Sequence, residues 1–303
     1  MDCLEEFLAA KGEKNKASTV DEKERLLKRH FRFEGDVSKI DDRQVSKALR
    51  AIKAPSERRH AFVEGRTFFN WLVKARRIPY SPFVALEAPR KGEGRERVLT
   101  DEELVAVWLN SRETSYGQII RLIIITGQRP GQIGGLKGEY VNPDELLISW
   151  PGEVMKGNKR HSIPLTDMAA DMLCMCRQGN SYDALHCGLL FPTKNGNPFG
   201  ALARNKERLD VASGVSSWVH QDLRRTWATK AADWEIADPY IIERILAHQL
   251  PGISQVGPTY NRAKYLAPMR LALERFEIKL MELVDKHGEN HPRRNGSLPN
   301  EAA

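Results

Sequence analysis

The sequence has few cysteines and no long apolar run, and both absences narrow the class of protein. Four cysteines in 303 residues are too few and too irregularly spaced for a disulfide framework. The densest apolar stretch, residues 119–125, is interrupted by Arg121 and is far shorter than the roughly 20 residues that cross a bilayer. The first ten residues carry acids and no basic segment, unlike a secretory signal. A cytoplasmic protein without a membrane partner is therefore expected.

What the chain does contain is a charge excess confined to its first third. Residues 1–100 hold 23 Lys and Arg against 16 Asp and Glu, a net charge of +7, which equals the net charge of the whole chain. Residues 101–303 are therefore neutral overall. A basic module joined to a larger neutral one suggests that the first part holds a polyanion while the second has another task. A lysine-rich solvated surface is the alternative that composition leaves open.

Residues 1–88 have the pattern of a small helical domain, consistent with the expectation of two domains at this length. Three helices are predicted, over 20–29, 41–52 and 56–76, the first capped by Ser18 or Thr19. The apolar residues of the third share one stripe of period 3.6, namely Phe62, Phe69, Leu72 and Val73. Arg59 and Arg66, seven positions apart, share another side, as on a helix along a phosphate backbone or on any exposed helix.

Residues 89–96, with Gly and charges, are predicted to be a linker, and a second domain is predicted over 97–286. Its start is marked by a capping box of Thr100 and Glu103, with Leu99 and Leu104 as the hydrophobic staple.

The second domain is expected to combine helices with a few short strands. Its elements are helices over 101–110 and 117–127, strands near 145–150 and 155–165 with a turn at Gly157–Asn158, a helix from Asp238–Pro239 to Ala247, and a long helix over 263–286. The polar tail 287–303 is expected to be disordered.

Three short segments of the second domain carry the functional signal. They are TGQRPGQ with Arg129, QDLRRTWAT with Arg224, and ILAHQ followed by PTYNRAKY with His248 and Tyr260; Lys156 lies between the first two, in MKGNK. Each is weak alone, because Arg129 could be an ion-pair partner at the surface and Tyr260 a core residue. Their order along the chain is the informative feature.

In that order the chain resembles the tyrosine recombinase, or phage integrase, family. Residues 19–88 are similar to its core-binding domain and residues 97–285 to its catalytic domain. The resemblance implies a mostly α fold: a helical SAM-like core-binding domain and an α+β DNA breaking-rejoining catalytic domain with a small antiparallel sheet. Together the two domains would form a clamp around duplex DNA.

The activity implied by the resemblance is site-specific recombination, which integrates or excises a phage or mobile element through a 3′-phosphotyrosine intermediate. Tyr260 matches the nucleophile, Arg129 and Arg224 the phosphate clamp, Lys156 the general acid and His248 a phosphate hydrogen-bond partner. Arginine binds phosphate oxygens bidentately and stays charged. No metal and no cofactor are therefore expected.

Two positions depart from the family pattern. Gln221 stands where many members have histidine, with His220 one residue earlier, and Gln132 stands where many have an acid. Gln221 can hydrogen-bond a phosphate oxygen but cannot transfer a proton. We interpret both changes as tuning of an active enzyme. A DNA-binding relative with impaired catalysis and a type IB topoisomerase-like enzyme are the alternatives.

The expected partners follow from the same resemblance. They are a duplex attachment or recombination site, three further copies of the chain in a homotetramer on DNA, and accessory DNA-bending or directionality proteins, which would place the protein at the nucleoid. The DNA-binding residues expected in the first domain are Arg58, Arg59, Arg66, Lys74, Arg76 and Arg77.

Several residues have competing assignments. Tyr265 is the rival nucleophile, expected instead to pack at the start of the last helix, and Lys159 is the rival of Lys156. Arg225 is expected to form a structural ion pair. A zinc site is not expected at Cys174, Cys176, His186 and Cys187, whose spacing is irregular. The histidines expected at the surface are His30, His60, His161 and His291.

Overall fold

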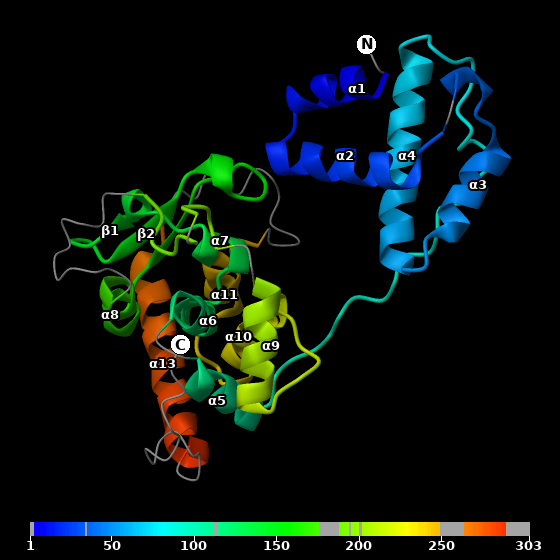
Figure 1. The fold of residues 1–303 in the computed structure, drawn as a ribbon. Coiled ribbons are helices and arrows are strands. Elements are labelled where there is room, and N and C mark those ends of the chain that lie inside the picture. The colour runs from blue at the N-terminus through cyan, green and yellow to red at the C-terminus, as the bar shows by residue number, and fades with distance from the viewer. Residues whose placement is uncertain are drawn as a thin grey trace. The chain divides into compact units, whose positions relative to one another are not determined.

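The computed structural model describes residues 3–33, 35–111, 114–175, 188–193, 195–199, 202–248 and 264–288. The chain divides into two compact units, residues 1–95 and 96–303, each with its own hydrophobic core (Figure 1). Among the helices of the described ranges, none combines the length and the apolar character needed to cross a membrane.

The first unit is built around one long helix. Its helices are α1 (Cys3–Gly12), α2 (Ala17–His30), α3 (Asp42–Ala51) and α4 (Pro55–Lys74), with a 3-10 turn at Val37–Lys39. α4 packs against the other three helices and buries the predicted stripe, with Phe62, Phe69 and Leu72 in the core. Gly65 allows this packing, because a Cβ there would lie 2.5 Å from the ring of Phe83.

The predicted second and third helices are confirmed as α3 and α4, and Asp41 caps α3 in a capping box with Gln44. The predicted start of the first helix is wrong. α2 begins at Ala17, so Ser18 and Thr19 lie inside its first turn, and the N-cap residue Lys16 does not cap the helix with its side chain. α2 packs on α1 and α4, and such tertiary packing can stabilise a helix that lacks a side-chain cap.

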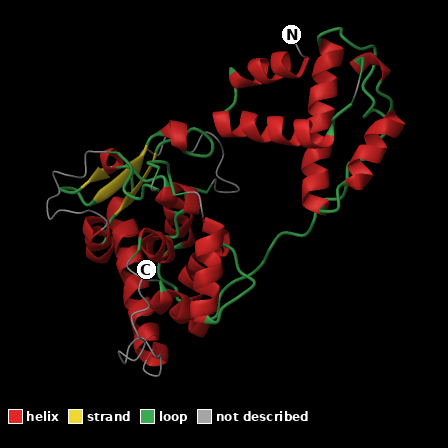
Figure 2. Cartoon of the chain, viewed as in Figure 1, coloured by secondary structure: helices red, strands yellow, loops and turns green. Residues whose placement is uncertain are grey.

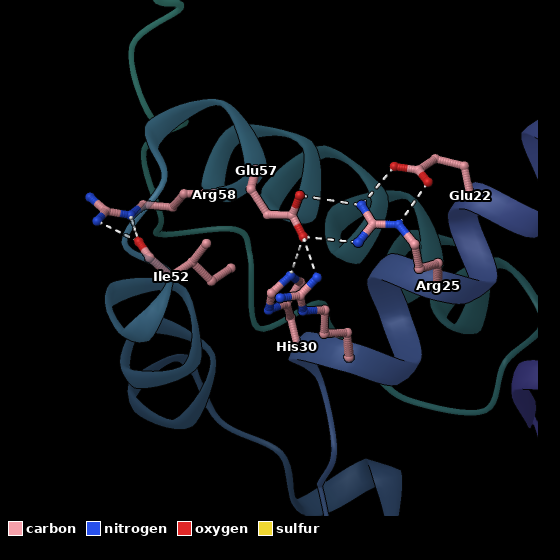
Figure 3. Close-up of polar contacts among 7 residues, drawn as sticks. Glu22, Arg25, His30, Ile52, Glu57 and Arg58 are labelled. Atoms are coloured by element: carbon pink, nitrogen blue, oxygen red, sulfur yellow. Dashed lines mark hydrogen bonds and ion pairs between the residues drawn. The ribbon is translucent and has the colours of Figure 1, made fainter. Parts of the chain in front are cut away.

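Ion pairs between α2 and α4 neutralise much of the charge on these helices (Figure 3). Glu57 of α4 accepts hydrogen bonds from Arg25 Nη1 at 3.0 Å and from His30 Nε2 at 2.9 Å, and Arg25 also pairs with Glu22. The Arg25 hydrogen bond, then that of His30, lowers the pKa of Glu57 to about 2. The prediction of a surface His30 is wrong, since its side chain is only 12% exposed.

The second unit combines many helices with a small sheet (Figure 2). Its helices are α5 (Asp101–Asn110), α6 (Ser115–Thr126), α7 (Pro130–Gly134), α8 (Asp167–Met175), α9 (Leu202–Ser213), α10 (His220–Asp233), α11 (Pro239–Ile245) and α13 (Leu266–Gly288), with 3-10 turns at Gly138–Tyr140 and Gly152–Val154. The antiparallel sheet has the order β1 (Val141–Asn142), β2 (Leu147–Trp150), β3 (His161–Pro164). The predicted mostly helical class with a small antiparallel sheet is confirmed.

Helix α6 lies at the centre of this unit. Nearly all of its side chains are buried, as expected for a helix that is apolar around most of its circumference, and α5, α7, α8, α10 and α13 pack around it. At the start of the unit, the predicted capping box of Thr100 and Glu103 is confirmed, with Leu99 and Leu104 both buried. The core therefore forms around α6, and its C-terminal end supports the site described below.

The last helix begins three residues later and ends two residues later than predicted. α13 extends to Gly288, and His287 Nδ1 lies 3.7 Å from Glu102 Oε1, so the expectation of disorder is wrong for His287. Residues 289–303 lie outside the described residues.

Burial of an acid on α13 makes stability depend on pH. Glu277 is 8% exposed and accepts a hydrogen bond from Thr166 Oγ1. Burial, with smaller contributions from Glu274 and Asp167, raises the pKa of Glu277 to about 7, against the effect of Thr166. The folded chain therefore holds this proton more tightly than the unfolded chain, and stability should fall as pH rises from about 4.5 through 7. We expect Glu277→Gln to remove this contribution, on the order of 3 kcal/mol.

The measurement is thermal unfolding of wild type and Glu277→Gln at pH 5 and pH 8. The melting temperature of wild type should fall more between the two values than that of the variant does. Glu282→Gln is the matched control, because Glu282 lies exposed on the same helix. Equal decreases for wild type and Glu277→Gln would contradict the assignment.

Candidate active site

The first component of the site is the sharp junction between α6 and α7. α6 ends at Thr126, and its C-cap is Gly127, whose φ of +64° is left-handed; a Cβ there would lie 2.7 Å from the Trp227 ring. Glycine is therefore required both for the turn and for the close approach. Arg129 follows two residues later, half-buried, and its backbone N–H donates to Gln132 Oε1 at 3.1 Å. The segment TGQRPGQ thus fixes Arg129 between two helices.

The second component, Arg224, lies in the second turn of α10. It is 3% exposed, and its Nη1 donates to the carbonyl of Gly127 at 2.9 Å, while Nη2 donates to the carbonyl of Leu246. The start of α10 is fixed by Asp222, which accepts from the Val219 N–H. Asp222 also binds Arg225, so the prediction of a structural ion pair for Arg225 is confirmed.

The third component, His248, follows the C-terminal end of α11. Asp238 caps this helix as predicted. Its C-terminal end is a Schellman motif, in which the His248 N–H donates to the Glu243 carbonyl and the Ala247 N–H to the Arg244 carbonyl. Ala247 occupies the left-handed position with φ +51°, where glycine is usual. The predicted helix therefore stops at Ile245, two residues early, and the reversal of the chain aims His248 at α10.

Arg224, His248 and Glu243 form a hydrogen-bonded chain. His248 Nε2 lies 2.9 Å from Arg224 Nη2, and His248 Nδ1 lies 2.7 Å from Glu243 Oε2. Because a guanidinium only donates, Nε2 must accept, and Nδ1 must carry the proton that Glu243 accepts. His248 is therefore a neutral Nδ1–H tautomer here, and Glu243 orients its ring.

The two arginines make the site strongly cationic. Burial first, and then the charge of Arg129, lowers the pKa of Arg224 to about 9, against the effect of Glu243, and burial also lowers the pKa of Arg129. In the described part of the chain neither guanidinium has a carboxylate within ion-pair distance. Burying Arg224 fully and Arg129 in part without a direct counter-ion is costly, and such arrangements are typical of anion-binding functional sites.

Lys156 lies on the loop between β2 and β3. The Asn158 N–H donates to the Met155 carbonyl at 3.2 Å, and Gly157 has φ +93°, so Lys156 and Gly157 are the central residues of a type II turn. Met155 is buried, and its sulfur accepts from Gln132 Nε2 at 3.0 Å, which ties this loop to the start of α7 beside Arg129. Lys156 and its rival Lys159 are both exposed.

The two glutamine departures have different surroundings. Gln132 connects the backbone of Arg129 to the lysine loop, as described. Gln221 is exposed in the first turn of α10. Its neighbour His220 faces α6, where Nε2 lies 3.0 Å from the hydroxyl of Tyr116, and burial, followed by the charge of Lys206, lowers the pKa of His220 to about 4.

Tyr260 lies outside the described residues, so its place relative to the arginines stays a prediction. Tyr265 directly precedes α13. Its ring packs against Tyr240 at a centroid distance of 5.3 Å, with the Arg244 guanidinium 4.9 Å from its centroid.

The residues considered for zinc also fall largely outside the description. Cys176, His186 and Cys187 lie beyond the described residues, as does the side chain of Cys174. Within the described ranges, no group of three or more His, Cys, Asp or Glu side chains could hold a metal ion.

One histidine expected at the surface is part of the site. His161, the first residue of β3, is 9% exposed and stacks on Trp150 at a centroid distance of 5.9 Å, so the prediction is wrong. Its Nε2 lies 3.1 Å from the carbonyl of Ile245. Nothing in the sequence singles out this position, because the contact joins residues 84 positions apart. His60 is exposed as predicted, and His291 lies outside the described residues.

In the first unit, the candidate DNA-binding residues divide into two groups. Arg58 donates to the Ile52 carbonyl, Arg59 to the Pro89 carbonyl, and Arg77 pairs with Glu6. The second group, exposed and without an acid partner among the described residues, is Arg66, Lys74 and Arg76; Arg77 is exposed as well. A second basic stripe, which the sequence pattern did not reveal, follows α3 at Arg43, Lys47 and Arg50, all exposed and without an acid partner among the described residues.

This constellation agrees with the family found by comparison. A family model described as the phage integrase family matches residues 97–265, and the chain belongs to that family. Prophage integrase IntZ of Escherichia coli K12 is 28% identical over 172 residues, which cover 56% of this chain and 40% of IntZ. Tyrosine recombinase XerC of Xanthomonas campestris is 24% identical over 233 residues, covering 73% of this chain and 70% of XerC. The chain spans about half the length of the first curated relatives it matches.

Solved structures share the fold at low sequence identity. A lambda integrase (75–356) dimer bound to a COC′ core site superposes with a TM-score of 0.64 at 16% identity, over 83% of this chain and 96% of that one. The Tn1549 transposon integrase (82–397) in complex with circular intermediate DNA gives 0.59 at 14% identity, over 86% and 94%. A lambda integrase tetramer bound to a Holliday junction gives 0.64 at 18% identity, over 82% and 77%.

Proposed function

We propose that the protein is a site-specific tyrosine recombinase that cleaves and rejoins duplex DNA, integrating or excising a phage or mobile element. The observation that supports this most is the pair of half-buried Arg129 and buried Arg224, which have no direct carboxylate partner among the described residues and are joined to His248 through Arg224. A phosphodiester supplies the negative charge that this pair lacks. The family and the solved relatives on DNA support the same substrate.

In the proposed reaction the phenol oxygen of Tyr260 attacks the scissile phosphorus. As the phenol proton passes to His248 Nε2, a bond from that oxygen to phosphorus forms. The bond from phosphorus to the 5′-oxygen breaks, and the leaving oxygen takes a proton from Lys156. Arg129 and Arg224 donate to the non-bridging oxygens, where charge increases in the transition state. Reversal by the 5′-hydroxyl of a partner strand reseals the DNA without external energy.

His248 has a defined part in this scheme. Its ring is neutral, with Nε2 held by Arg224 and the Nδ1 proton held by Glu243. When Arg224 turns a donor to phosphate, Nε2 becomes available to a protonated phosphate oxygen or to the nucleophile. Gln221, exposed on the first turn of α10, can donate an amide proton to phosphate but cannot take one up.

The test is covalent trapping on a nicked suicide substrate that carries the DNA flanking the element. The full chain should form a complex that survives SDS, and because the arginines supply the positive charge, the complex should persist in excess chelator. Its disappearance in chelator with rescue by magnesium would overturn the metal-free mechanism. Binding without a covalent complex would indicate the impaired relative, and relaxation of supercoils without site preference would indicate the topoisomerase-like enzyme.

The proposed assembly is a homotetramer bound to two DNA duplexes at the nucleoid. Accessory DNA-bending or directionality proteins would bind the same DNA. Closed symmetry would bring four copies of the site to one junction. The lambda integrase tetramer on a Holliday junction supports this proposal by fold alone.

A prediction concerns the DNA-facing surface of the first unit. The logarithm of the binding constant should fall linearly with the logarithm of salt concentration, and the slope should become less negative by about 0.9 for each phosphate that the protein no longer neutralises. We expect Arg59→Gln combined with Arg66→Gln to flatten the slope. Arg25→Gln is the matched control, because Glu57 and Glu22 already compensate its charge.

The stripe on α3 provides the alternative outcome. Arg43, Lys47 and Arg50 span seven positions, or about 10 Å along a helix axis, a length over which two or three phosphates of one strand can be reached. The double substitution of Arg59 and Arg66 could leave the salt slope unchanged while replacement of Arg43, Lys47 and Arg50 flattens it. In that case the DNA lies against α3 instead of α4.

A further inference from the structure

The C-terminal end of α11 is held by side chains from three other parts of the fold. The carbonyl of Ile245 accepts from Gln128 Nε2 at 2.8 Å and from His161 Nε2 at 3.1 Å, and the carbonyl of Leu246 accepts from Arg224. The donors come from the α6–α7 junction, from β3 and from α10. Helix ends expose carbonyls that have no partner within the helix, so these donors complete the end of α11.

This end carries backbone strain. Ala247 adopts φ +51°, which glycine tolerates and alanine resists, and His248 is the next residue. A strained residue persists where its surroundings fix it, and such residues concentrate at functional sites. The hydrogen bonds to the carbonyls of Ile245 and Leu246, the two residues before Ala247, are suited to hold Ala247 in this conformation.

His161 is built to donate to this carbonyl. A carbonyl only accepts, so Nε2 must carry the proton, and the stack on Trp150 restricts rotation of the ring. Burial first, and then the charges of Arg224 of α10, Arg129 before α7 and Arg244 of α11, lowers the pKa of His161 to about 4. These charged groups are all cations, so His161 stays neutral around neutral pH.

Gln128 is a second unusual choice. It is fully buried, and its Nε2 donates to the carbonyls of Thr126 and Ile245. Its Oε1 is buried with no hydrogen-bond partner in the described structure. An unsatisfied buried oxygen destabilises a fold, whereas leucine would fill similar space without that cost. The amide is therefore poorly explained by stability and well explained by the donor that it supplies.

We propose that His161 and Gln128 are positioning residues for His248: they hold the carbonyl of Ile245 so that the strained turn at Ala247 aims the His248 ring at Arg224. The consequence for DNA cleavage rests on the proposed function. Neither residue touches the phosphate in this scheme. Both act through the backbone of α11, and a displacement of about 1 Å of a reacting group can reduce a rate about 100-fold.

The experiment uses the full chain and four variants. Gln128→Leu removes one donor, His161→Phe removes the other while keeping a ring on Trp150, and His161→Gln restores an amide N–H near the Nε2 position. Ala247→Gly, combined with His161→Phe, removes the strain at the turn. Single-turnover cleavage of the suicide substrate, the DNA dissociation constant and the melting temperature are measured for each.

For Gln128→Leu we expect cleavage to slow by about 10- to 100-fold, with an unchanged DNA dissociation constant and a melting temperature equal to or above that of wild type. For His161→Phe we expect a similar decrease, recovered to within about threefold by His161→Gln and in part by the added Ala247→Gly. The rate of His161→Gln should show the same pH dependence as wild type between about pH 6 and 9, because neither side chain titrates there. A purely structural role would instead lower the melting temperature and the rate together.

A readout without DNA separates this inference from the proposed function. The 15N shifts of His248 report its Nδ1–H tautomer in the free protein, and they should change in Gln128→Leu and His161→Phe. Wild-type shifts and wild-type cleavage in both variants would overturn the inference. Altered shifts together with a wild-type chain that never forms a covalent complex would leave the positioning role standing and reject the recombinase.

Discussion

Tyr260→Phe should bind recombination-site DNA as wild type does and form no covalent complex with it. Removal of one oxygen deletes the atom that would be bonded to phosphorus, while the arginines that bind phosphate remain. The expected effect is complete absence of the SDS-resistant complex on the suicide substrate, with an unchanged dissociation constant from a gel-shift titration. The reason for choosing Tyr260 is its place in the family order, 12 residues after His248.

The matched control is Tyr265→Phe. Tyr265 packs on Tyr240 beside the Arg244 guanidinium at the start of α13, so its ring already has a structural role that phenylalanine retains. This variant should still cross-link. If Tyr265→Phe forms no covalent complex while Tyr260→Phe forms one as wild type does, the nucleophile is Tyr265.

A second large effect is expected at the leaving group. Lys156→Ala should reduce cleavage of ordinary DNA by about 100- to 10,000-fold, the usual contribution of a general acid. A substrate with a bridging 5′-phosphorothiolate has a leaving sulfur that needs no proton, so it should restore most of the rate of this variant. Cleavage of both substrates under single-turnover conditions gives the comparison.

Two controls define this result. The cleavage rate of Arg129→Ala should be restored far less by the sulfur substrate, because the charge of Arg129 acts on the non-bridging oxygens of either substrate. Lys159→Ala should cleave both substrates at nearly the wild-type rate, although Lys159 lies on the same exposed loop. If the sulfur substrate instead restores the cleavage rate of Lys159→Ala, the general acid is Lys159, three residues further along the loop. Absence of rescue in both lysine variants would assign the proton to another group, with His220 as the nearest remaining candidate in the sequence.

The structure sets limits on that last candidate. His220 is turned toward Tyr116 of α6, and its pKa is lowered to about 4 by burial and then by Lys206. A histidine in that state holds no proton to donate at neutral pH. A rate that required His220 as the acid would therefore decline above about pH 4, a profile that distinguishes it from lysine.

Much of the local structure was predictable because it depends on neighbours in the sequence. The predicted capping box at Thr100 joins residues three positions apart, and the turn at Gly157 needs only a residue that tolerates positive φ. The stripe of Phe62, Phe69 and Leu72 follows from the helical period. The start of α2 was missed for the converse reason, since no side-chain cap marks it and the helix packs on α1 and α4.

Local patterns in the chain were enough to specify most of the helices, the caps at Thr100 and Asp238, a turn that includes Gly157, and the order of arginine, lysine, arginine and histidine by which the family is recognised. The burial of His161, the Ile245 carbonyl that it shares with Gln128, and the orientation of His248 by Glu243 became visible in the folded chain alone. The hydrogen bonds from Gln128 and His161 to Ile245 span 117 and 84 positions. No local period or propensity encodes such contacts, because they exist only once α6, β3 and α11 have packed together.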